Sequence, residues 1–431
     1  MRPDKPPLPV DFRREGPSPR WLITGLLLAH TGACAALAHS LHVFLALTSI
    51  AALFHLGLLF RPSPLDPLRP RTVLLVSAAM HFVAWGSPAI LSDDLYRYLW
   101  DGRVQLAGLN PYSLAPDAPG LEWLRDEIWP HINHREISTI YPPLAQYAFR
   151  VIAWAAYDPY AVKLVMGLAS FATTALLLYM NGGSRRAATW FGLSPLVALE
   201  CAGSGHLDAL GVLLLTAAAS LLCLRRPISG AIAVALTIGA KFLGVVLWPA
   251  LVRRHGLRGL AWCLAIGVAL YLPFIEIGPR LFSSLGTYAT TWEFNGPIYP
   301  ILEVLLDSSS AARVASALTM ISVSIIAYRR NWSPIRGAAI LIAILIALSP
   351  VVHPWYVLWL LPFAAILHWR WPFVLAATMP LAYEVLIGYQ DAGTWSPAPW
   401  TLVAIYGPVA IAAMLEWRAA PRDSCTEQIP T

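Results

Sequence analysis

The feature that most constrains the fold of this chain is a succession of apolar runs, most of them about 20 residues long. Only 13% of the 431 residues are charged and 57% are hydrophobic, whereas a soluble domain carries roughly 25% charged residues. Apolar runs of that length cross the hydrocarbon core of a bilayer as α-helices. The sequence therefore predicts an all-α, polytopic transmembrane helical bundle with about 11–13 membrane helices. The runs lie at residues 21–40, 43–60, 72–91, 161–180, 187–203, 206–224, 228–252, 257–275, 311–328, 335–351, 354–369, 371–388 and 399–417.

Arginine residues concentrate in the short connections between these runs, and their distribution predicts the orientation of the chain in the membrane. Positively charged connections favour the cytoplasmic side, which puts a leader at 1–20 and a tail at 418–431 in the cytoplasm. The transmembrane domain then spans 21–417, with a first outward loop at 92–158 and a second at 276–298. The net charge of +6 is spread over these turns and does not predict a nucleic-acid partner. The orienting residues are Arg61, Arg69, Arg71, Arg185, Arg186, Arg225, Arg226, Arg253, Arg254, Arg329, Arg330 and Arg370.

Two apolar segments do not fit this orientation as ordinary spans. If segment 141–157 crossed the membrane, Arg185 and Arg186 would face outward, so we expect an interfacial or re-entrant helix there. Segment 228–252 has arginines at both ends, and about 25 residues are too few for two full spans. Two half-helices that meet near Lys241 satisfy both constraints, because irregular backbone at membrane depth is tolerated where it lines a cavity. Lys241 is therefore a candidate cavity-lining residue.

The unusual polar residues of the chain share the outward ends of the apolar segments in this orientation. They are Asp93, Asp94 and Asp101 in the first loop, Glu200, His206 and Asp208 at a turn, Lys241, and His353 and Tyr356 at a later turn. A carboxylate at the aqueous edge of a dry pocket can act as a general base. Lysine and histidine side chains nearby can receive the charge of a phosphate. The sequence contains no P-loop, G-x-G-x-x-G or G-x-S-x-G motif, so soluble nucleotide chemistry is not indicated.

The acid pair also has a purely structural interpretation, which the sequence leaves open. Ser92 followed by Asp93 and Asp94 is a typical helix start, where such side chains cap orphan N–H groups and complement the helix dipole. Asp93, Arg97 and Asp101 are spaced four residues apart, so they could instead form an ion ladder on a solvated helix face.

The deeper polar residues have structural alternatives as well. His206 and Asp208 could bond loop carbonyls, and Lys241 could extend its amine to the membrane surface. The turn at His353 could be a kink within an aromatic belt. Asp93, Asp208 and His353 could also form a metal site, but no pair has the ligand spacing typical of metal-binding motifs. We therefore predict no bound metal.

Three motifs, in this order, resemble a known family. They are SDDLYRYLWDGRVQLAGLNPY at 92–112, IYPPLAQYAF at 140–149 and GSGHLDAL at 203–210. The chain resembles membrane glycosyltransferases of the GT-C fold that use a polyprenyl-phosphate sugar as donor, and most of all the bacterial polyprenyl-phosphate-mannose-dependent α-mannosyltransferases. The resemblance covers residues 72–360. It implies a GT-C transmembrane bundle in the bacterial inner membrane, with the active site facing the periplasm or exterior.

The resemblance also assigns roles to residues. Asp93 matches the position of the catalytic base, and Asp94 matches that of its partner. Lys241 and His353 stand where family members contact the donor phosphate. The full set of implied contacts to donor or acceptor is Arg97, Asp101, Arg103, Tyr141, Gln146, His206, Asp208, Lys241, His353 and Tyr356.

The function implied by the resemblance is that of an inverting glycosyltransferase with no cofactor. Such an enzyme would move a sugar, mannose by family likeness, from a polyprenyl-phosphate donor to a glycan or lipid-linked acceptor. Its partners would be this donor, the acceptor and membrane lipids. The alternatives are a structural subunit, and a transporter or flippase of a lipid-linked or polar solute, which also uses intramembrane charges. Transporters are often built from inverted repeats, and the sequence contains no recognisable internal repeat.

Overall fold

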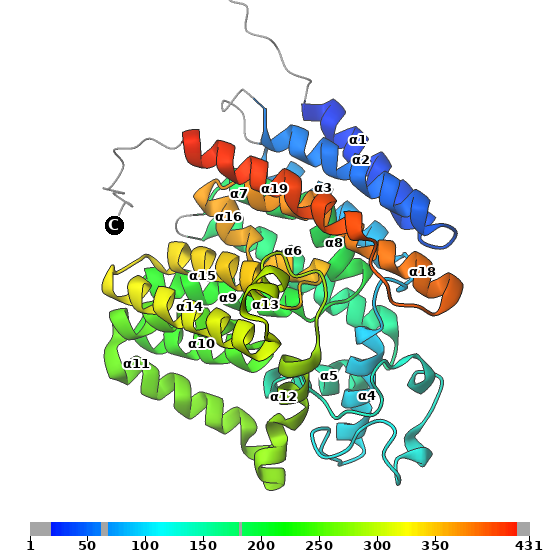
Figure 1. Cartoon of the computed structure of the whole chain (residues 1–431), viewed down its shortest axis with the longest axis vertical. Helices are drawn as coiled ribbons and strands as arrows, with labels where there is room; N and C mark the ends of the chain where they lie inside the picture. Colours follow the sequence, from blue (N-terminus) through cyan, green and yellow to red (C-terminus); the bar gives the residue numbers. More distant parts are fainter. Residues whose placement is uncertain (1–18, 62–67, 181–182, 420–431) are drawn as a thin grey trace, which may run out of the picture.

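The computed structural model describes residues 19–61, 68–180 and 183–419, and these residues form a helical bundle (Figure 1). They contain no β-strand, and extended backbone pairs only in isolated bridges between two turns of the described chain. The predicted all-α polytopic fold is confirmed. Most of the expected leader at 1–20 and of the tail at 418–431 lies outside the described residues.

Proline residues set the beginning of many of these helices. Proline suits the first helical position, because its fixed φ angle is helical and its missing N–H would have no helical partner there. Pro70, Pro159 and Pro227 occupy this position in three helices. The first part of the chain forms α1 (Pro19–Ala36), α2 (Leu41–Leu59), α3 (Pro70–Trp85), α4 (Asp94–Leu106), η1 (Glu122–Leu124), η2 (Trp129–His131) and α5 (Pro143–Ala155).

The rest of the chain builds the centre and the far side of the bundle. The middle part forms α6 (Pro159–Tyr179), α7 (Arg185–Gly192), α8 (Pro195–Ala198), the π-helix η3 (Leu199–Gly203), α9 (Asp208–Cys223), α10 (Pro227–Ala240), η4 (Phe242–Leu247), α11 (Trp248–Tyr271), η5 (Leu272–Phe282) and α12 (Ser283–Thr291). The last part forms α13 (Tyr299–Leu306), α14 (Ser309–Arg329), α15 (Pro334–Leu348), η6 (Pro354–Trp359), α16 (Leu361–Leu367), α17 (Trp371–Thr378), η7 (Met379–Glu384), α18 (Val385–Ala392) and α19 (Pro399–Ala419). Helix α1 packs on α2, α9 packs on both α6 and α10, and α17 packs on α19.

Six stretches of the described chain are long and apolar enough to cross a membrane, and one bent helix pair would make a seventh. Stretches of this length in the described chain are thus fewer than the about 11–13 membrane helices expected from apolar runs alone, because several runs form shorter helices. The runs at 187–203, 228–252 and 354–369 are divided into shorter helices by prolines and irregular turns. The six stretches are Leu41–Leu59, Pro159–Tyr179, Phe242–Thr291, Ser309–Arg329, Trp371–Gln390 and Pro399–Ala419.

Two helix breaks in the bundle position polar residues. The segment formed by α8 and η3 meets α9 at an angle of 119°, and the turn between them contains His206 and leads directly into Asp208. The second break is at Lys241, whose extended backbone separates α10 from η4. Because α10 packs along both η4 and α11, the chain reverses at Lys241, as the sequence predicts.

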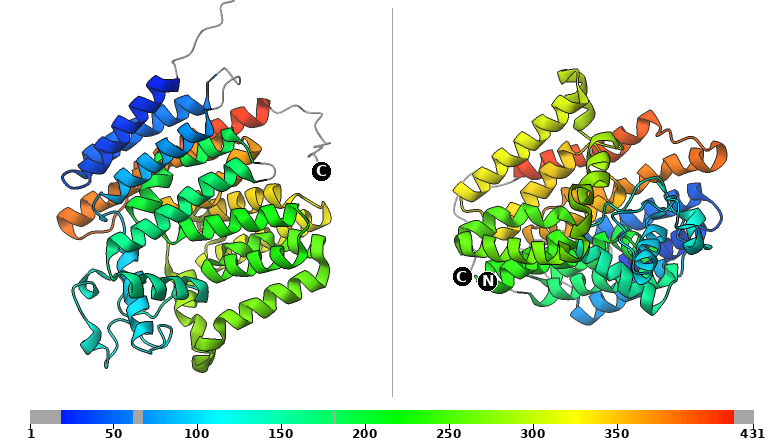
Figure 2. Two further views of the ribbon diagram at one scale, coloured as in Figure 1. Left: turned by 180° about the vertical axis from the view of Figure 1, so that it is seen from behind. Right: turned by 90° about the horizontal axis from the view of Figure 1, so that it is seen from below.

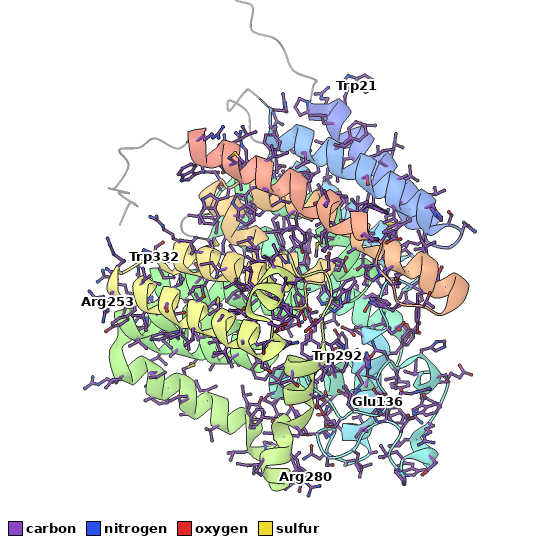
Figure 3. All side chains as sticks on the ribbon, in the orientation of Figure 1. Trp21, Glu136, Arg253, Arg280, Trp292 and Trp332 are labelled. Atoms are coloured by element: carbon purple, nitrogen blue, oxygen red, sulfur yellow. The ribbon has the colours of Figure 1, made fainter. Side chains whose placement is uncertain are left out.

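The first outward loop forms a unit at one end of the bundle, as the views from the front and from behind agree (Figures 1 and 2). Its helix α5 has 13 residues, or about 20 Å, which is shorter than the roughly 30 Å of a hydrocarbon core. This length fits the expectation that segment 141–157 does not span. The second loop contacts the first, since the hydroxyls of Ser138 and Ser284 lie 2.7 Å apart. Figure 3 shows Arg253 at the end of the bundle opposite to Glu136.

We predict that Gly102→Ala lowers the stability of the protein, because α4 and α5 cross closely at this position. An added Cβ would lie 2.4 Å from the carbonyl oxygen of Phe149 and 2.7 Å from the Cβ of Ala153. Overpacking of this kind costs about 1–3 kcal/mol, which would be measured as a lower midpoint of thermal unfolding in detergent. Gly407→Ala is the control, since a Cβ there meets no atom within 4 Å. Equal effects of the two substitutions would contradict the close crossing.

Candidate active site

The acid pair Asp93 and Asp94 begins α4, at the end of the bundle where the loop 92–158 lies (Figure 1). The hydroxyl of Ser92 accepts a hydrogen bond from the N–H of Asp94 at 3.3 Å, so the serine provides a cap. Asp93 occupies the N-cap position, but its carboxylate makes no capping bond. The helix dipole stabilises both negative charges at this end. Capping therefore does not account for the two carboxylates.

Tyr98 connects the acid pair to the bend that precedes α9. Its hydroxyl donates to Oδ2 of Asp94 and accepts from the N–H of Leu207, each at 3.4 Å. The buried ring of Tyr98 stacks on Phe149 of α5 with centroids 4.5 Å apart, and the ring of Tyr141 contacts it edge-on at 5.1 Å. These aromatic contacts fix the position of Asp94 relative to the turn at 204–207.

The two acids differ in their surroundings. Asp94 is half-buried beneath Tyr98, whereas Asp93 is exposed. The exposed carboxylate is still flanked by protein, so partial desolvation and the charge of Asp94 raise the pKa of Asp93, and nearby His131 opposes this shift. A raised pKa brings a carboxyl group closer to the range in which it accepts a proton near neutral pH.

Asp208 is a buried residue at the start of α9 and forms an ion pair with the partly exposed Lys241. Its Oδ2 lies 2.7 Å from Nζ of Lys241, and its Oδ1 accepts a hydrogen bond from Nε1 of Trp359 at 2.5 Å. The Lys241 amine also lies over the rings of Tyr356 and Trp359, 5.5 and 5.6 Å from their centroids. The amine therefore points toward Asp208 and the two aromatic rings and does not extend to the membrane surface.

His206 belongs to a second buried network on the same bend. Its Nδ1 lies 3.0 Å from a carboxylate oxygen of Glu200, and the hydroxyl of Tyr383 donates to the same carboxylate at 2.8 Å. Because a carboxylate only accepts, Nδ1 of His206 carries the hydrogen. Nε2 is buried and has no partner among the described residues. Glu200 lies in the π-helix η3, a conformation often found at functional sites.

Aromatic stacking joins His206 to His353. The ring of Trp355 stacks on His206 at 3.8 Å and on His353 at 4.3 Å between centroids. The second outward loop reaches the same place, because the hydroxyls of Tyr288 in α12 and Tyr356 in η6 lie 2.6 Å apart. One cluster of side chains therefore forms where five parts of the chain meet. These parts are the bend before α9, the break at 241, the turn at 353 and the two loops at 92–158 and 276–298.

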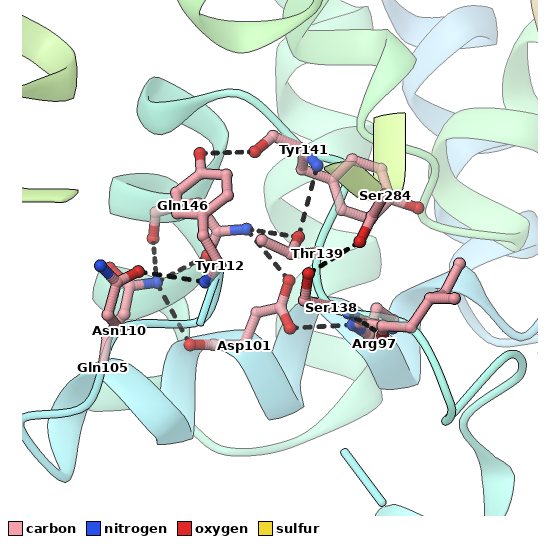
Figure 4. A network of polar contacts seen from close by, with 11 residues as sticks. Arg97, Asp101, Gln105, Asn110, Tyr112, Ser138, Thr139, Tyr141, Gln146 and Ser284 are labelled. Carbon is pink, nitrogen blue, oxygen red and sulfur yellow. Dashed lines mark hydrogen bonds and ion pairs between the residues drawn. The ribbon is translucent and has the colours of Figure 1, made fainter. Parts of the chain in front are cut away.

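Arg97, Asp101 and Gln146 lie in a separate network that joins α4 to α5 (Figure 4). Nε of Arg97 donates to Oδ1 of Asp101 at 2.9 Å, and Nε2 of Gln146 donates to the other oxygen at 3.0 Å. The guanidinium also donates to the carbonyl of Ile137, and the amide of Gln146 also donates to Thr139. The Arg97 and Asp101 side chains are only 6% and 2% exposed, so this pair is not a solvated ladder. These polar groups are engaged within the protein, which fits a positioning role better than substrate contact.

Arg103 lies apart from the cluster. It is about 15 Å further along α4 than Asp93, and its guanidinium pairs with Asp126 and lies over the ring of Tyr157. The structure therefore does not support the expected contact between Arg103 and a phosphate. The predicted residues that it brings to one region are Asp93, Asp94, Tyr141, His206, Asp208, Lys241, His353 and Tyr356.

Several aromatic residues of the cluster have no distinctive sequence signal. They stand in apolar or amphipathic segments, where the sequence does not distinguish them from aromatic residues of a membrane belt. These residues are Tyr98, Tyr288, Trp355, Trp359 and Tyr383. Within the described ranges, no group of three or more His, Cys, Asp or Glu side chains is arranged to hold a metal ion.

The sequence matches known proteins along most of its length. Residues 20–255 match the family described as alpha-(1->6)-mannopyranosyltransferase, N-terminal domain, and residues 300–418 match the MptB C-terminal domain. Alpha-(1->6)-mannopyranosyltransferase A of Mycobacterium tuberculosis is 24% identical over 384 residues, covering 78% of this chain and 70% of the relative. No solved structure matches the chain.

The two matched regions extend the resemblance beyond the motifs. The first covers more than half of the chain and includes the acid pair, the bend and Lys241. The second covers the C-terminal part, including His353 and Tyr356. The matches favour an enzyme over the transporter and structural alternatives. The chain belongs to the alpha-(1->6)-mannopyranosyltransferase family and is an α-mannosyltransferase of the GT-C type.

Proposed function

We propose that this α-mannosyltransferase moves mannose from a polyprenyl-phosphate donor to a glycan or lipid-linked acceptor on the extracytoplasmic side of the bacterial inner membrane. One observation carries the proposal. Hydrogen bonds through Tyr98 join Asp94 to the bend that holds Asp208 and its partner Lys241. A base for the acceptor and cations for a phosphate are thereby held in one cluster. The proposed reaction uses no cofactor and no metal.

Asp93 is the proposed general base. It removes the proton from an acceptor hydroxyl, and the hydroxyl oxygen forms a bond to the anomeric carbon of the donor. The bond between that carbon and the phosphate oxygen breaks, and its electron pair leaves with polyprenyl phosphate. A single displacement of this kind inverts the anomeric centre, so a β-linked donor gives an α-linked product. A phosphate leaving group needs no proton, and one carboxylate is therefore sufficient.

The proposed contacts to the donor phosphate are Lys241, His206 and His353. The ammonium of Lys241 has three N–H donors, and Asp208 accepts from one of them. Nε2 of His206 is without a partner in the described chain, and it can donate to a phosphate oxygen in the imidazolium form, in which both ring nitrogens carry a hydrogen. His353 adds a second imidazole across the ring of Trp355.

The placement on the extracytoplasmic side is supported by the arginine turns, which favour the cytoplasm. Arg253, in one of these turns, lies at the end of the bundle opposite to the outward loops (Figure 3).

We predict that Asp93→Asn reduces mannose transfer by roughly 10²–10⁴-fold, because that is the usual contribution of a general base. The assay follows labelled mannose from polyprenyl-phosphate mannose into an acceptor present in a native membrane extract. Folding of the variant is checked by thermal unfolding. Full activity of a folded Asp93→Asn protein would rule out Asp93 as the base.

Asp94→Asn is expected to retain activity and to change its dependence on pH. The charge of Asp94 raises the pKa of Asp93, and a base is active only when deprotonated. Removing that charge lowers the pKa of Asp93, so the acidic limb of the kcat/KM profile moves to lower pH. An inactive Asp94→Asn protein beside an active Asp93→Asn protein would reverse the two roles.

We predict that Lys241→Gln destabilises the protein by roughly 3–5 kcal/mol, since it leaves the buried Asp208 carboxylate without a counter-charge. The double variant Lys241→Gln with Asp208→Asn removes both charges and recovers thermal stability. It still has a KM for the donor that is higher by roughly tenfold, because the phosphate loses a charged donor. A stable double variant with the native donor KM would exclude Lys241 from phosphate binding.

A further inference from the structure

We infer that a cavity beside the proposed phosphate cluster binds a sugar residue of the acceptor glycan. The cavity has a volume of about 340 Å³, within the roughly 300–1,000 Å³ of small-molecule pockets. It is lined by residues 293–296, Tyr299, Pro300, Pro350, Trp395 and Pro397. That the bound sugar belongs to the acceptor rests on the function proposed above. That the ligand is a sugar is argued from the residues that line the cavity.

The cavity adjoins the cluster through one side chain. The ring of Phe294 contacts His353 on one side, at 5.2 Å between centroids, and Trp395 on the other, at 5.4 Å. Two backbone hydrogen bonds hold Phe294 in place. Its N–H donates to the carbonyl of Pro350 at 2.9 Å, and its carbonyl accepts from the N–H of Val352 at 2.8 Å. A ligand in the cavity is thus one aromatic ring away from the imidazole assigned to the donor phosphate.

Glu293 gives the cavity a prearranged acceptor group. Its Oε1 accepts from Arg313 at 2.9 Å, from Ser309 at 3.2 Å and from Tyr299 at 3.4 Å. Its Oε2 has no protein partner among the described residues, and the side chain is 43% exposed. A carboxylate held on one side and open on the other is suited to accept hydrogen bonds from hydroxyl groups.

The aromatic wall completes a surface suited to a pyranose. The Trp395 indole is half exposed and offers a flat apolar face, against which the C–H face of a sugar ring can pack. The open Oε2 of Glu293 disfavours a phosphate by repulsion, and a hydrocarbon chain would leave this oxygen without a hydrogen bond. A neutral ligand that is rich in hydroxyl groups can donate hydrogen bonds to the Glu293 carboxylate and pack its C–H face on the Trp395 indole. The cavity therefore fits a glycan residue better than the headgroup or the tail of the lipid donor.

The geometry of the backbone around the cavity allows no larger residue at Gly296. A Cβ there would lie 2.6 Å from the carbonyl oxygen of Ser349, so this glycine lets the turns at 296 and 349 approach each other. Asn295 beside it adopts a left-handed conformation with φ of 57°, and its carbonyl accepts from the hydroxyl of Tyr406 at 2.7 Å. The cavity wall is thereby tied to two separate parts of the chain, at residues 349 and 406.

The test measures binding and kinetics on the full chain in detergent. The probe is a methyl α-mannotrioside, and its binding is followed by saturation-transfer NMR in the absence of donor. We expect Trp395→Ala and Glu293→Gln each to weaken binding, and to raise the KM of a mannosyl acceptor, by roughly five- to tenfold. The donor KM and kcat should stay at their native values, and Trp395→Phe should retain most of the binding. Trp400→Ala is the matched control, since this tryptophan is equally exposed and does not line the cavity.

The outcomes separate this inference from the proposed function. The inference is overturned if the native protein does not bind the trisaccharide. It is also overturned if the folded variants have the same KM for the acceptor as the native protein. A higher donor KM in the variants would assign the cavity to the lipid donor and would also overturn it. If the native protein transfers no mannose from polyprenyl phosphate but binds the trisaccharide through Trp395, the sugar site stands and the proposed reaction fails.

Discussion

The ion pair of the buried Asp208 with Lys241 is the interaction on which the arrangement of the site depends. A charged side chain inside a membrane protein is costly unless it is paired and faces the interior. Pairing these two residues requires both that the chain bends before α9 and that it reverses after α10. Trp359 adds a bond from the C-terminal part of the chain. Three interrupted helices thus converge on one carboxylate, and their irregular backbone is tolerated because it faces a polar interior.

A second set of contacts determines how the outward loop is placed against this centre. The Arg97, Asp101 and Gln146 network binds α4 to α5, and Gly102 allows the two helices to cross closely. The acid pair at the start of α4 is thereby carried on a rigid two-helix unit. Catalytic groups are effective only when their positions are held within fractions of an ångström. The polar residues inside this unit bond to one another and thereby help to hold α4, with the acids at its start, against α5.

The sequence predicts the large features of this molecule better than the partners of single residues. Arginine placement and run length predict the reversal at Lys241, because arginines at both ends of segment 228–252 require its two ends to lie on the same side. The same argument predicts that segment 141–157 does not span, and the 13 residues of α5 fit this prediction. The spacing of Arg97 and Asp101 is the same for a solvated and for a buried pair, so their burial was not predictable. Arg103 resembles a phosphate ligand until its ion pair with Asp126, 23 residues away in sequence, is known. Hydropathy also does not reveal where an apolar run is divided, because local turns leave the hydropathy of the run unchanged, so several runs of the described chain form shorter helices than expected.

The charge balance of the cluster bears on how a lipid phosphate would be bound and released. Lys241 is already neutralised by Asp208, so the cluster does not offer a strong isolated cation to an anion. Attraction then comes from the unused N–H groups of Lys241 and from the imidazoles of His206 and His353, in surroundings made dry by Trp355, Trp359 and Tyr356. In such surroundings hydrogen bonds to phosphate are strong, yet Asp208 competes for the same ammonium. In the proposed reaction, the groups that stabilise polyprenyl phosphate as a leaving group also bind it as a product, which slows its release. Competition from Asp208 for the Lys241 ammonium limits this affinity and so favours release.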